Sequence, residues 1–415
     1  MSDLIKLRPT QTRVKHDILE RYLRSWGGII INGLAAKAQR VASRGRTFDL
    51  HFVYVDCNAS VGRFLGEIGE TPGTPSPSKV FGSPIIGVRS LDDLARTALA
   101  RGINLRTNAI LIEKKSQEFR ELQQSLDMAG LGPRVRQTND FSGLQNGEIA
   151  VLRADSTMLT QELIAYTQTG YTFSLYFLDP YGPLAIPLPY VRDIITQPRH
   201  DVIINMPYQD LHKKAGSVTK LHPTPAEVEI LQNYDDMYGS TGWRQFAAGD
   251  IDEFGLVNYY RQILSATDAD LAVKSIPLHF PTKERTMFHL FLTTHDCDGA
   301  LRMNEILDKA GYLEHTLRWE LKQHNKRGTQ LLLSPDFDVP APPLQTPIRA
   351  TPEEIADQIY RQFRGKTVTL KKICSFLADE DYFHAEVKNA IAYLKKTGRA
   401  TYGRDLNNDT QIQIS

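Results

Sequence analysis

The sequence lacks any long hydrophobic run. No stretch approaches the roughly 18 uninterrupted apolar residues that a membrane-spanning helix needs. The first residues, MSDLIKLRPTQTRVKHDIL, contain no apolar core of the kind found in export signals. We therefore expect a cytoplasmic protein with no membrane partner.

Cysteine is also scarce. The three cysteines, Cys57, Cys297 and Cys374, are far apart and odd in number, which is typical of a chain kept in a reducing compartment. No structural zinc set can be built from their spacing, and no histidine lies near Cys57 to activate it as a nucleophile, so we expect a small buried residue there. Residues 295–298, His-Asp-Cys-Asp, carry metal-capable atoms, but adjacent residues rarely converge on one ion. We predict a helix N-terminus capped by Asp298 at this point, and no metal site.

Charge of one sign is not in excess, because the net charge is only +1. Its distribution is less even, since residues 1–48 hold ten Lys/Arg against three Asp/Glu. Within this N-terminal extension, the spacing of apolar residues predicts a helix over 11–46 with a break at Gly27-Gly28. A basic helix of this kind can face nucleic acid, although a solvated helix face is the commoner explanation.

What the chain has instead is an alternation of short apolar runs with helical patterns. The runs predict strands at 50–55, 108–113, 148–153, 173–178 and 201–206. Because parallel neighbours need a crossover helix between them, this spacing predicts an α/β fold with a mostly parallel, Rossmann-like sheet.

The end of this pattern differs from its beginning. Residues 207–271 show helical patterns but no clear strand, and we interpret them as a helical insertion. Two further strands, at 273–280 and 287–294, are separated by only six residues, PTKERT, too few for a helical crossover. They should form an antiparallel hairpin, which is the layout of the class I methyltransferase sheet rather than that of a plain dinucleotide-binding fold.

The chain divides into two domains. A proline-rich linker at 334–350 follows the sheet domain, 1–333. The remaining residues, 351–415, predict a helix, a strand, two helices and a pair of short β segments, which is the order of elements in a winged helix.

Small and polar residues follow the first three predicted strands. A cofactor with an adenosine half and a charged methionine half needs a close-approach turn after the first strand, an acid after the second for the ribose hydroxyls, and a polar residue after the third for the adenine amine. The candidates for binding S-adenosylmethionine are Asp56, Asn58, Ser60 and Gly62, then Glu113, then Asp155 with Ser156. An acid at a strand end is by itself more typical of a helix cap, so the alternative is an α/β protein with polar strand ends and no cofactor.

The fourth strand ends in Asp179-Pro180-Tyr181-Gly182, which we take as the catalytic segment. Amino-methyltransferases carry an Asp or Asn, a proline and an aromatic residue at this point. The Asp179 carboxylate and the Pro180 carbonyl would accept hydrogen bonds from the target amine, while Tyr181 stacks on the base. The sequence D-P-x-G is also common in β-turns, and a plain turn is the alternative.

Two groups of residues are candidates for substrate binding. Asn205 and Tyr208 lie where the fifth strand ends. Lys388, Lys395 and Lys396 lie on the predicted recognition helix of the C-terminal domain and could contact phosphates. Because Lys/Arg and Asp/Glu nearly balance in that domain, ten to nine, a winged helix that contacts protein is an equal alternative.

Several segments in order resemble the three-Cys-motif partner (TcmP) family over about residues 14–310. They are VKHDILERYLRSW, YVDCNASVGRF, GSPIIGV, ILIEKK, YFLDPYG, DVIINM and FHLFLTTHDCDGALRMNEIL. The resemblance implies a class I methyltransferase-like fold and, as partner, a protein with a three-cysteine motif. The family's first motif usually reads D-G-F-A-G-x-G, whereas this chain has Cys57, Asn58 and Ser60 in place of glycine, the aromatic residue and glycine.

These observations predict an S-adenosylmethionine-dependent methyltransferase that acts on a base amine of a nucleic acid, DNA or RNA. The alternative is a non-catalytic protein of the same fold that binds nucleic acid or a three-cysteine-motif partner protein. The D-P-Y-G segment favours the first interpretation, and the altered glycine loop favours the second.

Overall fold

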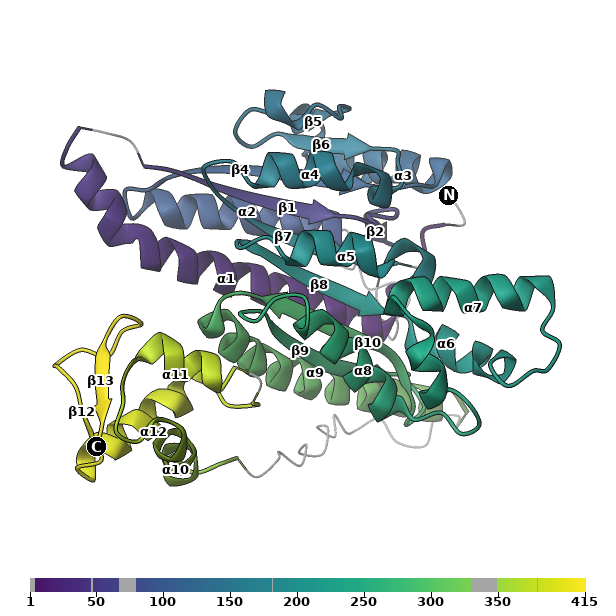
Figure 1. The fold of residues 1–415 in the computed structure, drawn as a ribbon. Coiled ribbons are helices and arrows are strands. Elements are labelled where there is room, and N and C mark those ends of the chain that lie inside the picture. Colours follow the sequence, from purple (N-terminus) through teal and green to yellow (C-terminus); the bar gives the residue numbers. More distant parts are fainter. Residues whose placement is uncertain (1–3, 46–47, 67–79, 181, 330–348, 379) are drawn as a thin grey trace.

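A computed structural model describes residues 4–45, 48–66, 80–180, 182–329, 349–378 and 380–415. Its central sheet is built from β1 (Asp49–Asp56), β4 (Asn104–Ile112), β5 (Val135–Arg136), β6 (Ile149–Leu152), β7 (Tyr171–Leu178), β8 (His200–Met206), β9 (Ala272–His279) and β10 (Thr286–Thr294). Their order across the sheet is β5-β6-β4-β1-β7-β8-β10-β9. The strands from β5 to β8 pair in parallel, and β10 pairs antiparallel with both β8 and β9 (Figure 1). The predicted α/β fold with a mostly parallel sheet is confirmed.

Helices cover both faces of this sheet (Figure 1). One face packs on α1 (Thr10–Ala42), α2 (Ser83–Leu99), α3 (Ser116–Met128) and α9 (Cys297–Thr329). The other packs on α4 (Thr160–Thr167), α5 (Leu188–Ile195), α6 (Tyr208–Lys214), α7 (Pro225–Tyr238) and α8 (Glu253–Ser265). Side chains along β1 alternate between the two cores, with Phe52 and Tyr54 in the first and Val53 and Val55 in the second. Because β1 is central and both of its faces are covered, five of the six residues between its terminal aspartates are apolar, with His51 as the exception.

The N-terminal helix does not break at Gly27-Gly28. Helix α1 continues through both glycines, so the predicted break is wrong. A Cβ atom at Gly27 would lie 2.4 Å from Cδ1 of Leu94 on α2. The glycine therefore serves the close approach of two helices, and the packing gained there outweighs its low helix propensity.

The C-terminal unit contains α10 (Pro352–Phe363), β11 (Thr367–Thr369), α11 (Leu370–Phe376), α12 (His384–Lys396), β12 (Ala400–Thr401) and β13 (Gln411–Ile414). Helix α10 begins with a capping box between Thr351 and Glu354, and the three strands pair in the order β11-β13-β12. Its apolar core is continuous with Ala272 of β9 and with Ala300 and Leu301 of α9. Of the predicted linker, only residues 349 and 350 lie within the described part of the chain.

Polar contacts reinforce this junction. The Asn304 side-chain amide on α9 donates to the backbone carbonyls of Glu380 and Tyr382 at 2.9 and 2.8 Å. Buried amide–carbonyl bonds fix the relative position of two elements more specifically than apolar contact alone. No helix within the described residues combines the length and the apolar composition needed to cross a bilayer.

Candidate functional site

A cavity of about 690 Å³ lies where β1, β7 and β8 end. Six of the predicted site residues line it: Asn58, Ser60, Gly62, Asp179, Pro180 and Asn205. The first turns of α1 also line the cavity, through Gln11, Lys15 and His16. Strands of a parallel sheet end at one edge, so residues far apart in sequence meet there, which is why the strand-end pattern found them. No sequence pattern identifies the α1 residues as part of a site, because a lysine on a basic helix cannot be distinguished from one that faces solvent.

The Asp179 carboxylate is the best-connected group in this cavity. Lys15 Nζ donates to both of its oxygens at 2.7 Å, and Asn205 Nδ2 donates to Oδ1 at 2.7 Å. The side chains of Lys15 and Asp179 are 6% and 20% exposed, so the ion pair is largely shielded from water. Charge-assisted bonds of this kind hold a carboxylate in one orientation.

Other buried polar atoms on the cavity wall have no hydrogen-bond partner within the described residues. They are Nδ1 of His16, Oδ1 of Asn58 and Oδ1 of Asn205. Burial, and then the positive charges of Arg8 and Lys15, lower the pKa of His16 well below its ordinary value, so the ring is neutral. Buried amide oxygens without a donor are costly, and this cavity therefore favours a ligand that carries N–H or O–H groups.

The loop after β1 forms the floor of the cavity. Its backbone is tied to the neighbouring strands, with Cys57 N–H donating to Phe177 O at 3.0 Å and Ala59 N–H to Ile112 O at 2.9 Å. Ser60 adopts φ +51°, the left-handed region that side chains with a Cβ rarely enter. Gly62 has φ +72°, and a Cβ there would lie 2.9 Å from Leu122 Cδ1. The loop thus has at Ser60 a backbone conformation that glycine adopts more readily.

Glu113 supports this loop and is not among the residues that line the cavity. Its two carboxylate oxygens accept from Ser60 N–H at 2.8 Å and from Lys115 N–H at 2.7 Å. Burial raises the pKa of Glu113, and the nearby Glu118 carboxyl adds to that, while the two backbone bonds oppose it. In this conformation both oxygens are engaged by backbone, and a role in holding ribose hydroxyls stays a prediction.

Asp56, the first residue of the predicted motif, lies beneath the loop with no solvent exposure. Tyr54 O–H donates to its Oδ2 at 3.0 Å and Asn58 N–H to its Oδ1 at 3.3 Å. Burial raises the pKa of Asp56 to about 7, against the opposing effect of these bonds. The neighbouring Cys57 is buried as predicted, and burial raises the pKa of its thiol to about 12, so this thiol is a poor nucleophile.

The candidates after the third predicted strand lie away from the cavity. Asp155 caps a short 3₁₀ turn through Thr157 N–H at 3.1 Å and pairs with Lys114 at 2.8 Å. Burial acts to raise the pKa of Asp155, but the bonds from Lys114 and Thr157 outweigh it and the pKa is lowered. Ser156 is buried beside Cys57. A separate cavity of about 640 Å³ opens at the end of β6, lined in part by Arg120 and Arg153.

The remaining candidates that the structure describes do not join the cavity. Gly182 and Tyr208 are not among its lining residues, and Tyr208 is buried against His289. Tyr181 lies outside the described residues. Lys388, Lys395 and Lys396 are all on α12 of the C-terminal unit. Of these, Lys395 donates to the backbone carbonyl of Tyr402 at 3.1 Å, and Lys396 is exposed.

The segment 295–298 begins a helix, as predicted, but the cap is a different residue. Asp296 Oδ1 accepts from Asp298 N–H at 2.9 Å and from Gly299 N–H at 3.4 Å, so Asp296 caps α9 and the assignment to Asp298 is wrong. Asp298 instead faces the C-terminal unit, where Asn408 Nδ2 donates to its Oδ2 at 2.6 Å. The reason is that a cap residue precedes the first turn, and Asp298 is already inside it.

Comparison with known proteins adds little to this description. No family model matches the chain, and no curated protein matches it. One solved structure with some likeness is protein LPL1258 from Legionella pneumophila str. Philadelphia 1, described as family DUF519. It is 13% identical with a TM-score of 0.32, over 69% of this chain and 85% of that one. A likeness at that level carries no argument about function.

Proposed function

We propose that this protein is an S-adenosylmethionine-dependent methyltransferase that acts on a base amine of DNA or RNA. The observation that carries the proposal is the meeting of Asp179 and Asn205 with the β1 loop around one cavity. Methyl transfer to an amine requires a cofactor loop and an amine-orienting carboxylate within reach of one another.

The order of the strands supports the same class. In class I methyltransferases a final antiparallel strand lies between the last parallel strand and the strand that precedes it in sequence. Here β10 lies in this way between β8 and β9. In open α/β sheets, ligands bind outside the carboxyl ends of the strands, where this cavity lies. The TcmP resemblance, the winged-helix assignment of the C-terminal unit and the contact of its α12 with nucleic acid are parts of this proposal.

Lys15 indicates what the carboxylate can bind. Its ammonium already donates N–H groups to both oxygens of Asp179, which is the kind of contact that a target amine would make. A carboxylate has about four lone-pair sites, so one site remains beside the bonds from Lys15 and Asn205. The unpaired Oδ1 atoms of Asn58 and Asn205 offer further acceptors for the amino groups of cofactor and substrate.

The test is binding and transfer measured on the full chain. Calorimetry with S-adenosylmethionine and with its demethylated product should show binding of both. Transfer of labelled methyl to nucleic acid from a host lacking the gene should fall by about 100-fold in Asp179→Ala, because a positioning group is lost, while cofactor binding is retained. Asp92→Ala, which removes a carboxylate paired with Arg134 on the outside of the molecule, is the matched control. Wild-type transfer in Asp179→Ala would refute the assignment of this residue.

A second function is favoured by specific contacts. Both oxygens of Glu113 are taken by backbone, and Lys15 occupies Asp179, so the chain itself fills two positions that a cofactor and a substrate would use. A non-catalytic protein that binds nucleic acid or a three-cysteine-motif partner would have this arrangement. Retention of DNA or RNA at low salt, without binding of S-adenosylmethionine or its product, would assign the chain to this function.

A further inference from the structure

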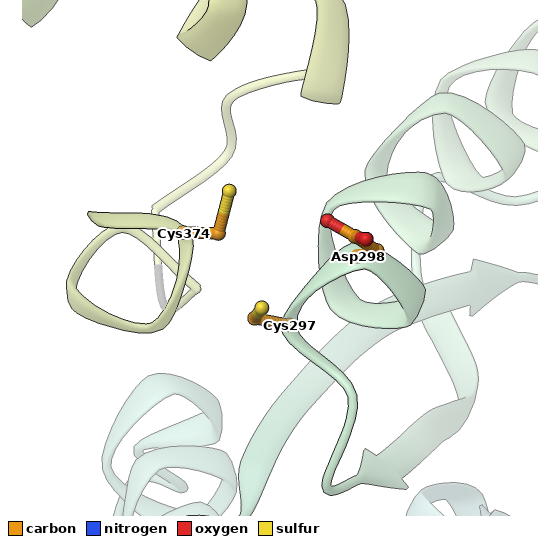
Figure 2. Close-up of side chains that lie close together, drawn as sticks. All are labelled: Cys297, Asp298 and Cys374. Carbon is orange, nitrogen blue, oxygen red and sulfur yellow. The ribbon is translucent and has the colours of Figure 1, made fainter. Parts of the chain in front are cut away.

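Two buried thiols meet where the C-terminal unit packs against the sheet. Cys297 is the first residue of α9, and Cys374 lies on α11. Their sulfur atoms and a carboxylate oxygen of Asp298 all lie within 4.8 Å of one another. Figure 2 shows the three side chains lying close together, with Cys374 on one helix and Cys297 and Asp298 at the start of the facing one. Sequence spacing does not reveal this cluster, because its members come from segments that meet only in the folded chain.

The spacing is close to what a tetrahedral metal site needs. With bonds of about 2.3 Å from zinc to sulfur and about 2.0 Å from zinc to oxygen, neighbouring ligand atoms lie roughly 3.5–3.8 Å apart. The three ligand atoms, which lie within 4.8 Å of one another, therefore have to approach by no more than about 1.3 Å.

A candidate for the fourth ligand contacts Asp298. His384, the first residue of α12, has its Nε2 atom 3.1 Å from Oδ1 of Asp298. Neither atom makes a further well-aligned hydrogen bond with any described residue, and both are shielded from solvent. His384 is not in the group of three whose ligand atoms lie within 4.8 Å of one another, so its ring has to turn toward the two sulfur atoms to complete the site.

The surroundings suit a cation as well. Binding through both sulfur atoms as thiolates would release the two thiol protons. Lys388 also faces Asp298 and would balance the negative charge left on the occupied site.

We propose that Cys297, Cys374, Asp298 and His384 form a tetrahedral site for zinc or a similar borderline-soft divalent cation. The bond from Asn408 Nδ2 to Oδ2 of Asp298, at 2.6 Å, orients the carboxylate from outside the site. Ligands come from α9 on one side and from α11 and α12 on the other, so the ion ties the C-terminal unit to the sheet. This role is structural and holds for either function proposed above.

The experiment uses the full chain, reduced and stripped of metal, titrated with Zn²⁺ against a chromophoric chelator. One zinc per chain is expected to bind with high affinity. Replacement by Co²⁺ should give a thiolate-to-cobalt charge-transfer band with the intensity of two thiolates. Cys297→Ser and Cys374→Ser should each lower the affinity at least about 100-fold, since changes outside the ligand set already cost 10–100-fold. Cys57→Ser, which alters the third buried cysteine away from the site, is the matched control and should bind as the wild type does.

A second measurement needs no variant. Zn²⁺ should protect Cys297 and Cys374, but not Cys57, from alkylation in partly denaturing urea, and a chelator should abolish that protection. The proposal is overturned if no stoichiometric zinc binds, if the serine variants bind zinc as tightly as the wild type, or if protection is equal at all three cysteines. It is also overturned if the two cysteines are isolated as a disulfide and take up no zinc after reduction.

Discussion

Lys15 and Asp179 are 164 positions apart in the sequence and form a largely buried ion pair at 2.7 Å. The pair joins the first turns of α1 to the end of β7. Because both side chains line the same cavity, the N-terminal helix is part of the candidate site. Breaking a buried pair from one side leaves an uncompensated charge, which costs more than the pair itself contributes.

Lys15→Met should therefore destabilise the protein. We expect the free energy of unfolding to fall by about 2–3 kcal/mol, slightly below the usual range for a fully buried pair because Asp179 is partly exposed. Arg21→Met on the same helix breaks an exposed pair with Asp17 and should change stability by no more than about 0.5 kcal/mol. Urea unfolding of both variants measures the difference, and equal stability of the two would contradict the burial argument.

Ser60→Gly should stabilise the β1 loop. A residue with a Cβ in the left-handed region costs about 1–2 kcal/mol, and glycine removes that cost while adding about 0.5–1 kcal/mol of unfolded-state entropy. The net gain should be up to about 1 kcal/mol by urea unfolding. Ser60→Ala keeps the strained backbone and should give no gain, so a stabilised alanine variant would show that the effect does not come from φ.

The buried carboxyl of Asp56 should make stability depend on pH. Its folded-state pKa of about 7 lies above its unfolded value of about 3.9, so the unfolded state releases the proton first as pH rises. Stability should therefore fall between about pH 4 and pH 7 and level off above, by at most about 4 kcal/mol. Asp56→Asn should remove this part of the fall, which a series of urea unfolding curves from pH 4 to 8 would show.

Asp201 should keep part of the pH dependence in the Asp56→Asn variant. Burial also raises its pKa to about 7, so it contributes a fall over the same interval, and the Asp56→Asn profile should be flatter but not flat. A profile of Asp56→Asn that runs parallel to the wild type would show that Asp56 is ionised in the folded state.

Substitutions of Glu113 can separate two roles of this residue, support of the β1 loop and binding of the cofactor. A glutamine has one acceptor oxygen, so one of the two backbone N–H groups loses its partner, and stability without any ligand should fall by about 1–3 kcal/mol. Glu305→Gln, at the exposed pair with Arg302, is the control. If Glu113 also holds the ribose, affinity for S-adenosylmethionine should weaken over the same energy range in Glu113→Ala. Unchanged affinity would restrict the residue to positioning the loop.

Much of the fold follows from local patterns. The predicted strands at 50–55, 173–178 and 201–206 lie within β1, β7 and β8, because each is an apolar run bounded by polar residues. The six-residue gap predicted the β9–β10 pairing for a simple geometric reason. The two-residue strand β5 was not predicted, since so short an element has no periodicity to detect.

The candidate site was predictable only in part. Strand ends identified Asp179 and Asn205, because sheet geometry brings them to one edge. Lys15 and His16 could not be found this way, since their place at the cavity depends on how α1 packs across the sheet. The role of Gly27 was not predictable either, because it depends on the close contact with Leu94, a residue on another helix.

The position of β10 has a consequence for synthesis of the chain. Strand β8 is completed about eighty residues before β10 leaves the ribosome, and until then its outer edge has unpaired N–H and C=O groups flanked by buried apolar side chains. Fragments that end before Thr286 would keep this open edge, and a nascent chain paused there would be prone to pair with other chains. Pairing with β10 is therefore the step that closes the edge of β8 in the growing polypeptide.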